Sequence, residues 1–495
     1  MSKDNEIDSP NRDDSSANQD DTKQLFHHAK NYLKASVFVS LLSSFTFLIF
    51  TYLLNVEEYG YLSIFNSLVS VFTILYLLNG HSGVARLLLD KLEDWGSILG
   101  ASLLFTGLWV LVFSSGLLFF SEDIAAYFKI PKIVLICALI VSIFSSLYQY
   151  LMIYLSTDQQ SARHSRISIR KKTISVFLGL LLVYSFEQDR YLGKIYTELI
   201  IGAVFFVYAF YELYKLAQFK AITRSHLSVS LRYGLPLIPH TLSRFILGYF
   251  DQLQINQISG GADTGRYAFA ANIAIFMGFI VTASGKAWHP IFIENYQKGA
   301  VIKIEKMSRP YANKIFLAAS FISLFVGDFI YLLVPKTYHS SVPLIPIIVL
   351  GYVCVFIYTL YFQYTAYRKK TELISTATLL AGVFNIILNA YYIPLYGYEA
   401  AAYTTLVSYG FLLLLHYLNA RVILKEHVIR FRTLLPGFAV TSVVLFIASY
   451  LYRQHQEFSL IYSFGIKGVL LVLVLMLFYR SSGENHGPRE THESD

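Results

Sequence analysis

Long apolar runs, each about the length of a helix that crosses a bilayer, follow one another along almost the whole chain. A backbone buried in lipid must satisfy its hydrogen bonds internally, and helices do so within a single segment. We therefore predict an all-α polytopic membrane protein of about fourteen transmembrane helices. The runs lie near residues 34–54, 59–79, 96–120, 131–156, 169–186, 192–214, 232–258, 265–290, 312–335, 342–367, 371–395, 398–420, 433–452 and 459–480.

The composition supports this prediction and excludes several other classes. Hydrophobic residues make up 55% of the 495 residues and charged residues only 15%, where a soluble domain has about 25% charged residues. The formal net charge of +8 is spread over short loops, which is typical of membrane topology rather than nucleic-acid binding. Cys137 and Cys354 are isolated in apolar runs, so we expect neither a disulfide nor a thiolate metal site. We also find no nucleotide-binding loop or metal-ligand motif, and we expect neither enzymatic chemistry nor a cofactor.

The distribution of Lys and Arg predicts the orientation of the chain. These residues concentrate in the loops that follow the even-numbered runs, and the bias never reverses along the sequence. Loops rich in Lys and Arg stay in the cytoplasm, so both termini are expected there. We expect residues 1–30 to form a disordered, acidic cytoplasmic tail, and we see no cleavable signal peptide before the first apolar run.

Features of the first half recur in the second half at an offset of about 205 residues. Gly60 corresponds to Gly265 at the start of a helix, and Asp123 corresponds to Asp328 near the end of one. Parallel repeats of this kind indicate two similarly oriented lobes with a cavity between them. The expected organisation is an N-lobe of six helices at 31–225, a C-lobe of six helices at 226–425, two further helices at 426–480 and a cytoplasmic tail at 481–495.

The seventh run carries charges that are costly inside a bilayer. Arg244 lies about a dozen residues into this run, near the midplane, where it either lines the cavity and binds phosphate or pairs with a buried group. His240 lies one turn earlier, as a second cavity residue or a packed core residue. Asp251 lies about 10 Å further along, too far to pair with Arg244, as a gating or coupling residue or a structural partner. Pro236 and Pro239 predict a kink, either a hinge or a static bend.

Three further basic residues are candidates for contact with a lipid-linked substrate. Lys286 lies near the cytoplasmic end of the eighth run, where it either recruits phosphate or extends to the interface. Arg86 is the best cationic candidate of the N-lobe, although a role in topology is the simpler explanation. Lys467 lies in the middle of the last run, next to a lipid groove or in a buried ion pair. Asn385 and Asn389 share one helix face and are expected to form hydrogen bonds between helices.

Several segments resemble one known family. The chain is similar to the polysaccharide and O-antigen flippases of the multidrug/oligosaccharidyl-lipid/polysaccharide exporter superfamily. The segments that carry the resemblance are VEEYGYLSIFNSLVSVF, YGLPLIPHTLSRFILGYFDQLQI, GRYAFAANIA, AWHPIF and NIILNAYYIPLYGYEAAAYTT, which together extend from about residue 30 to residue 430.

The resemblance implies a transporter of the cytoplasmic membrane. Its substrate would be an oligosaccharide repeat unit linked to a polyprenyl diphosphate, moved between leaflets by alternating access for exopolysaccharide or O-antigen biosynthesis. A polymerase and glycosyltransferases would be its partners. The mechanism is physically reasonable, because sugar hydroxyls cannot cross hydrocarbon without hydrogen-bonding partners.

Three other functions stay open at this stage. An ion-coupled multidrug exporter of the same superfamily needs acidic cavity residues, whereas the run 34–54 has none. A lipid II flippase would be expected to carry basic residues within the first helix, and these are missing from Ala35–Leu54. A non-transporting scaffold of a glycan-assembly complex would have no accessible cavity.

Overall fold

A computed structural model of the chain describes residues 13–90, 94–220, 222–454 and 460–483, and these residues form helices and short connections without a β-strand. Eleven of the described helices are long and apolar enough to cross a membrane. The prediction of an all-α polytopic membrane protein is confirmed, whereas the count of about fourteen remains a prediction.

Each predicted run coincides with helical structure. The three runs that are not among the eleven candidates are 169–186, which carries charges, 232–258, which is broken, and 459–480, whose apolar part is short. The helices are α1 (Asp13–Leu53), α2 (Val56–Leu77), α3 (Gly80–Leu89), α4 (Trp95–Phe119), α5 (Ser121–Tyr127), α6 (Lys132–Thr157), α7 (Ser161–Ser185), α8 (Arg190–Leu216), α9 (Arg224–Gly234), η1 (Leu235–Leu237), α10 (Ile238–Phe245), η2 (Ile246–Phe250), α11 (Asp251–Ser259), α12 (Gly261–Gln297), α13 (Val301–Leu333), η3 (Lys336–Ser341), α14 (Leu344–Tyr367), α15 (Thr371–Tyr396), α16 (Ala400–Leu418), η4 (Asn419–Ile423), α17 (Phe431–Arg453) and α18 (Leu460–Gly483).

The expected tail at 1–30 is wrong from Asp13 onward, because α1 begins at that residue. The sequence contains neither proline nor glycine between residues 13 and 53, so nothing interrupts the helix as it extends beyond its apolar part. Residues 1–12 and 484–495 of the two expected tails lie outside the described part of the chain.

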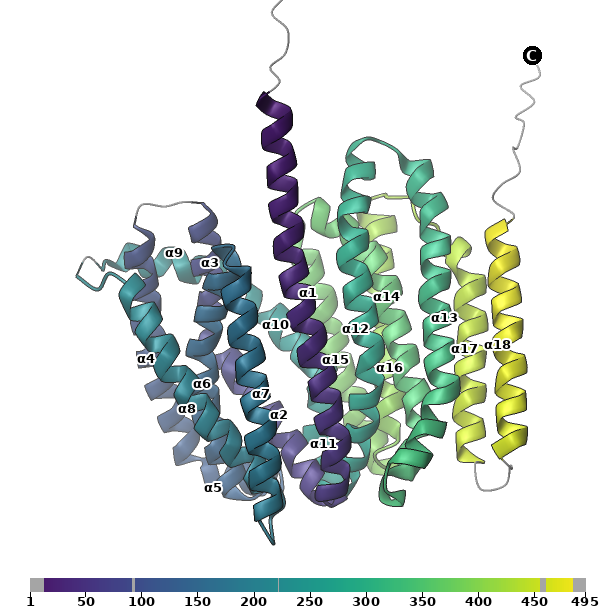
Figure 1. Cartoon of the computed structure of the whole chain (residues 1–495), viewed down its shortest axis with the longest axis horizontal. Helices are drawn as coiled ribbons and strands as arrows, with labels where there is room; N and C mark the ends of the chain where they lie inside the picture. The colour runs from purple at the N-terminus through teal and green to yellow at the C-terminus, as the bar shows by residue number, and fades with distance from the viewer. Residues whose placement is uncertain (1–12, 91–93, 221, 455–459, 484–495) are drawn as a thin grey trace, which may run out of the picture.

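The helices form two groups that stand side by side in Figure 1. In the first group α6 packs against α2 and α8, and α7 packs against α1 and α8. In the second group α14 packs against α12 and α16, while α17 and α18 pack along α13. We call these groups the first half and the second half. The start of α1 and the end of α18 lie at the same end of the molecule, the upper end in Figure 1.

At the lower end the two halves meet where α2 crosses α12. A Cβ atom on Gly60 would collide with the carbonyl oxygen of Gly261, and one on Gly265 would collide with the carbonyl oxygen of Val56. The two glycines that the internal repeat relates therefore allow backbone contact between the halves. Further contacts close this end, including hydrogen bonds from the Ser63 hydroxyl to Gln252 (2.6 Å) and from the Tyr52 hydroxyl to the Leu333 carbonyl (2.8 Å).

The seventh predicted helix is divided into pieces that contact both halves. Its first piece, α9, packs against α3 and α4 of the first half, whereas α10 and α11 pack mainly against α15 and α12 of the second half. The 3-10 turn η1, which contains Pro236, connects α9 to α10. Pro239 is the second residue of α10. The π-helical turn η2 follows. The predicted kink is confirmed, and the transition between halves occurs within it.

Candidate substrate site

Arg244 lies on α10, between the two halves of the molecule. Its side chain is exposed, although α10 contacts α2 of the first half and α15 of the second half. Within the described residues the Arg244 guanidinium forms no ion pair, and Asp251 forms its hydrogen bonds to other partners. The prediction that these two charges do not pair is confirmed, and the Arg244 guanidinium on α10 is left available for a ligand.

Two histidines and a tyrosine accompany Arg244. His240 on α10 interacts electrostatically with Arg244 and with His416 on α16. The His416 ring stacks on Tyr358 of α14, with ring centroids 5.0 Å apart and an interplanar angle of 15°. The Nδ1 atoms of both histidines are buried, and no group among the described residues forms a hydrogen bond with them. A buried ring nitrogen of this kind costs free energy unless a ligand or water completes its hydrogen bonds.

This arrangement suits an anionic or hydroxyl-rich ligand. A guanidinium binds phosphate oxygens through two parallel hydrogen bonds, and imidazoles donate or accept according to their tautomer. The sequence indicated Arg244 and His240 but missed His416 and Tyr358. Each of these lies in an apolar run, and only the packing of α14 and α16 against each other brings them to α10.

Asp251 lies at the centre of a buried polar network in the second half. Its carboxylate is 3% exposed and accepts hydrogen bonds from the Tyr267 hydroxyl (2.6 Å), the Asn389 amide (2.6 Å) and the Thr405 hydroxyl (2.7 Å). These donors come from α12, α15 and α16, so the network joins α11 to three other helices. Asn389 also donates to Asn385 (3.4 Å) and to Gln254 (3.1 Å). The expectation that the two asparagines bond between helices is confirmed, because Asn385 in turn donates to Thr405 (3.4 Å).

Lys286 and Arg86 are both exposed. Lys286 lies on the upper part of α12, where the described residues provide no ion-pair partner. Arg86 forms an ion pair with Asp90 on α3 (3.3 Å), in which both side chains are largely exposed. Such exposed pairs contribute little to stability. Within the described residues, neither Lys286 nor Arg86 forms a hydrogen bond or an ion pair with the groups around Arg244.

Lys467 lies in a buried ion pair, one of its two predicted alternatives. Its ammonium donates to both carboxylate oxygens of Asp328 (2.7 and 2.8 Å) and lies 4.5 Å from the centre of the Tyr452 ring. The Lys467 side chain is 1% exposed and that of Asp328 is 7% exposed. The pair joins α18 to α13, whereas Asp123, the counterpart of Asp328 in the repeat, is exposed.

A second polar cluster lies inside the first half, where the sequence had suggested only topological charges. Lys194 on α8 pairs with Glu198 and donates to the Ser175 hydroxyl of α7 (2.9 Å). Lys171 and Lys172 on α7 lie close enough to interact electrostatically with both charges. The sequence did not indicate this cluster, because Lys171 and Lys172 lie at the edge of an apolar run. On the helix α7, however, they lie on other faces than the lipid-facing residues.

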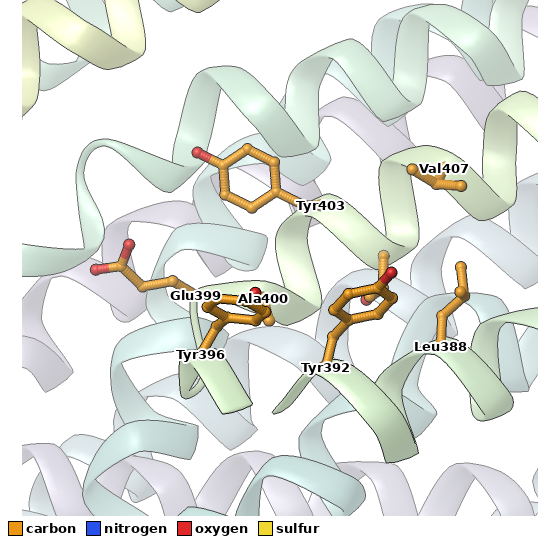
Figure 2. Close-up of a pocket in the computed structure, with 8 residues that line it drawn as sticks. Leu388, Tyr392, Tyr396, Glu399, Ala400, Tyr403 and Val407 are labelled. Atoms are coloured by element: carbon orange, nitrogen blue, oxygen red, sulfur yellow. The ribbon is translucent and has the colours of Figure 1, made fainter. Parts of the chain in front are cut away.

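A groove with a volume of about 490 Å³ lies on the second half near its lower end. Figure 2 shows Tyr392 and Tyr396 along α15 and Tyr403 on α16, with the Glu399 carboxylate to one side. Glu399 forms an ion pair with Arg453 (2.6 Å). Tyrosines gathered near the end of a membrane helix are typical of an interfacial belt, and we assign the groove no part in the substrate site.

Comparison with known proteins identifies similar sequences. Residues 49–294 match a family described as "Polysaccharide biosynthesis protein". A curated relative, the Lsg locus putative protein 1 of Haemophilus influenzae, is 28% identical over 270 residues. The aligned region covers 50% of this chain and spans 61% of the length of that relative.

Solved structures with a similar fold are membrane transporters. The lipid II flippase MurJ in an inward closed conformation superposes with a TM-score of 0.69 at 16% identity, covering 90% of this chain and 97% of the flippase. An inward-facing multidrug resistance MATE family transporter of the MOP superfamily gives a TM-score of 0.59 at 15% identity. That superposition covers 78% of this chain and 94% of the transporter. At these identities the likeness concerns the fold.

Proposed function

Because the chain belongs to the polysaccharide flippase family, we propose that it moves polyprenyl-diphosphate-linked oligosaccharides across the cytoplasmic membrane. Its family and fold are those of transporters. In this proposal the glycan units supply the synthesis of a cell-surface polysaccharide. In this proposal the start of α1 and the end of α18, at the upper end of Figure 1, face the cytoplasm.

The observation that carries the proposal is the exposed guanidinium of Arg244, which has no ion-pair partner in the described part of the chain. It lies beside two histidines whose Nδ1 atoms have no hydrogen-bond partner there either. The substrate combines a diphosphate with many hydroxyl groups, and this site offers a cation and uncharged hydrogen-bonding atoms together. A cationic drug would instead require a carboxylate. Asp251, the carboxylate on the adjoining helix α11, already accepts hydrogen bonds from three donors on neighbouring helices.

The contacts between the halves support transport by alternating access. The lower end is closed by backbone contact between α2 and α12, while α10 presents Arg244 above this closure. A substrate would thus enter from the cytoplasm in the conformation described, and separation of α2 from α12 would release it outside. Asp251 is our candidate for coupling this motion to an ion, because its network extends from α11 to α12 and α16.

The proposal is tested in a strain that lacks the gene. Deletion should leave lipid-linked oligosaccharide on the cytoplasmic leaflet and abolish its transfer to the surface polysaccharide. The wild-type gene should restore transfer, and a gene encoding Arg244→Ala should not. Normal surface polysaccharide with reduced efflux of cationic dyes would instead support the multidrug exporter.

Cysteine labelling distinguishes a transporter from a scaffold. A cysteine introduced at His240 or Arg244 should react with a water-soluble thiol reagent added from the cytoplasmic side. The two native cysteines are buried and should contribute little background labelling. Lack of labelling at both positions in intact, folded protein would contradict an open cavity and favour the scaffold.

A further inference from the structure

The first half contains a half-buried ion pair, and two more ammonium groups lie near it. Glu198 on α8 pairs with Lys194 and accepts a hydrogen bond from the Ser175 hydroxyl of α7 (2.8 Å). Gly179 leaves space for this arrangement, because a Cβ atom there would lie 3.3 Å from the Cδ atom of Lys194. The carboxylate is therefore already satisfied by one lysine and one hydroxyl.

Lys171 and Lys172 point away from the lipid-facing side of α7. The exposed apolar residues of this helix recur at Ile174, Phe177, Leu181 and Tyr184, and Arg170 shares their helical face. Lys171 instead lies one turn before Ser175 and places its ammonium 3.8 Å from the centre of the Tyr148 ring of α6. Lys172 lies on the face of the buried residues Val176, Gly179 and Val183.

The depth of these two lysines separates them from ordinary interfacial charges. Asn31 of α1 donates to the Ser161 hydroxyl at the start of α7 (3.2 Å), and the apolar part of α1 begins at Lys34. At 1.5 Å per residue, Lys171 and Lys172 lie about 10 Å below that level. A lysine on the lipid-facing side could extend back to the interface, but these two are half-buried on the other sides of α7.

The cluster has an excess of positive charge. Three ammonium groups face one carboxylate, and in the part of the chain that the structure describes neither Lys171 nor Lys172 forms an ion pair with an acidic side chain. Charges inside a membrane protein are normally paired or mark the path of a ligand. The contact of Lys171 with the Tyr148 ring compensates only part of the loss of hydration.

We propose that Lys171 and Lys172 bind the phosphate group of a lipid inside the first half, with Lys194 and Glu198 holding the neighbouring helices in place. The site rests on the proposed function for its source of phosphate, which would be the diphosphate of the substrate lipid. Its depth favours that source over a bulk phospholipid. The first half then contributes cations of its own, in addition to Arg244 on α10 between the halves.

The test measures binding of farnesyl diphosphate to the full chain in phosphatidylcholine nanodiscs by calorimetry. All proteins carry Arg244→Ala, so the cation of the proposed substrate site is absent. We expect the diphosphate to bind, and K171Q/K172Q to weaken binding by about tenfold or more, as loss of charge-assisted hydrogen bonds predicts. The matched control Arg170→Gln, on the lipid-facing side, should change binding by less than about twofold, in line with its exposed position.

Three further measurements complete the test. K171R/K172R keeps the charges and should retain binding, which separates charge loss from misfolding of K171Q/K172Q. Farnesol should not bind at this site. Replacement of part of the phosphatidylcholine by phosphatidylglycerol identifies the source: persistence of diphosphate binding supports the substrate lipid, whereas displacement supports a bulk phospholipid head group at the same lysines.

The proposal is overturned if K171Q/K172Q binds the diphosphate as tightly as Arg170→Gln, or if no binding occurs in the shared Arg244→Ala background. Neither result affects the proposed function, which is judged by glycan transfer in the deletion strain. Conversely, normal glycan transfer after deletion would refute the proposed function and leave diphosphate binding at the lysines intact.

Discussion

The buried ion pair between Lys467 and Asp328 permits a prediction in which each single substitution destabilises the fold and the double substitution largely restores its stability. Lys467→Met removes the ammonium and leaves the Asp328 carboxylate almost inaccessible to water, since that side chain is 7% exposed. An uncompensated buried charge costs about 3–5 kcal/mol. Asp328→Leu should cost less, about 2–3 kcal/mol, because the ammonium keeps its position 4.5 Å from the Tyr452 ring.

The double variant Lys467→Met/Asp328→Leu should be far more stable than the sum of the two single changes predicts. It leaves no buried charge and fills the same volume with apolar groups, and such replacements are often neutral or stabilising. We expect its free energy of unfolding to lie within about 1 kcal/mol of that of the wild type.

The assay is a titration with sodium dodecyl sulfate in mixed micelles, followed by circular dichroism. The matched control is Lys298→Met, which breaks an exposed ion pair with Glu294 (2.6 Å) and should cost less than about 0.5 kcal/mol. The reasoning is wrong if Lys467→Met costs no more than this control. It is also wrong if the double variant is as unstable as Lys467→Met alone.

Three other substitutions test the remaining parts of the molecule. Arg244→Ala should reduce glycan transfer in the complemented deletion strain by about 10- to 100-fold, the value of a charge-assisted hydrogen bond, and unchanged transfer would exclude substrate contact. Gly265→Leu should hold α2 away from α12 because a side chain there collides with Val56. A cysteine at Ser63 should then react faster with an impermeant reagent outside the cell, and equal rates in both backgrounds would argue against closure at this crossing. Asp251→Ala should lower the free energy of unfolding by about 3 kcal/mol or more, because its three donors lose their acceptor; a loss below about 1 kcal/mol would mean that water replaces the carboxylate.

The sequence predicted the fold class well because the length and spacing of apolar runs are local properties. It also predicted the break around Pro236, since proline removes a backbone donor wherever it occurs in a helix. The extension of α1 to Asp13 was missed because composition suggested disorder, whereas an uninterrupted helix continued through the polar residues.

The candidate site was predictable only where one residue was anomalous in its own segment. Arg244 is such a residue, because a charge near the midplane is costly regardless of its neighbours. His416 and Lys171 are ordinary in their segments: the first is one histidine near a helix end, and the second belongs to a basic run that also fits a cytoplasmic loop. Their significance depends on which helix they face, and only the packing of several helices determines that.

The divided seventh helix has a mechanical consequence. Since α9 packs against the first half and α11 against the second, residues 235–250 form a tether between the two halves. Any rocking of one half against the other must stretch, twist or rewind this tether, and its 3-10 and π-helical turns offer hydrogen bonds that can exchange partners at small cost. Arg244 lies on the tether itself. The Arg244 guanidinium would therefore move whenever the two halves move relative to each other. In the proposed transport cycle, the motion of the halves and the binding of the substrate would then depend on the same few turns of backbone.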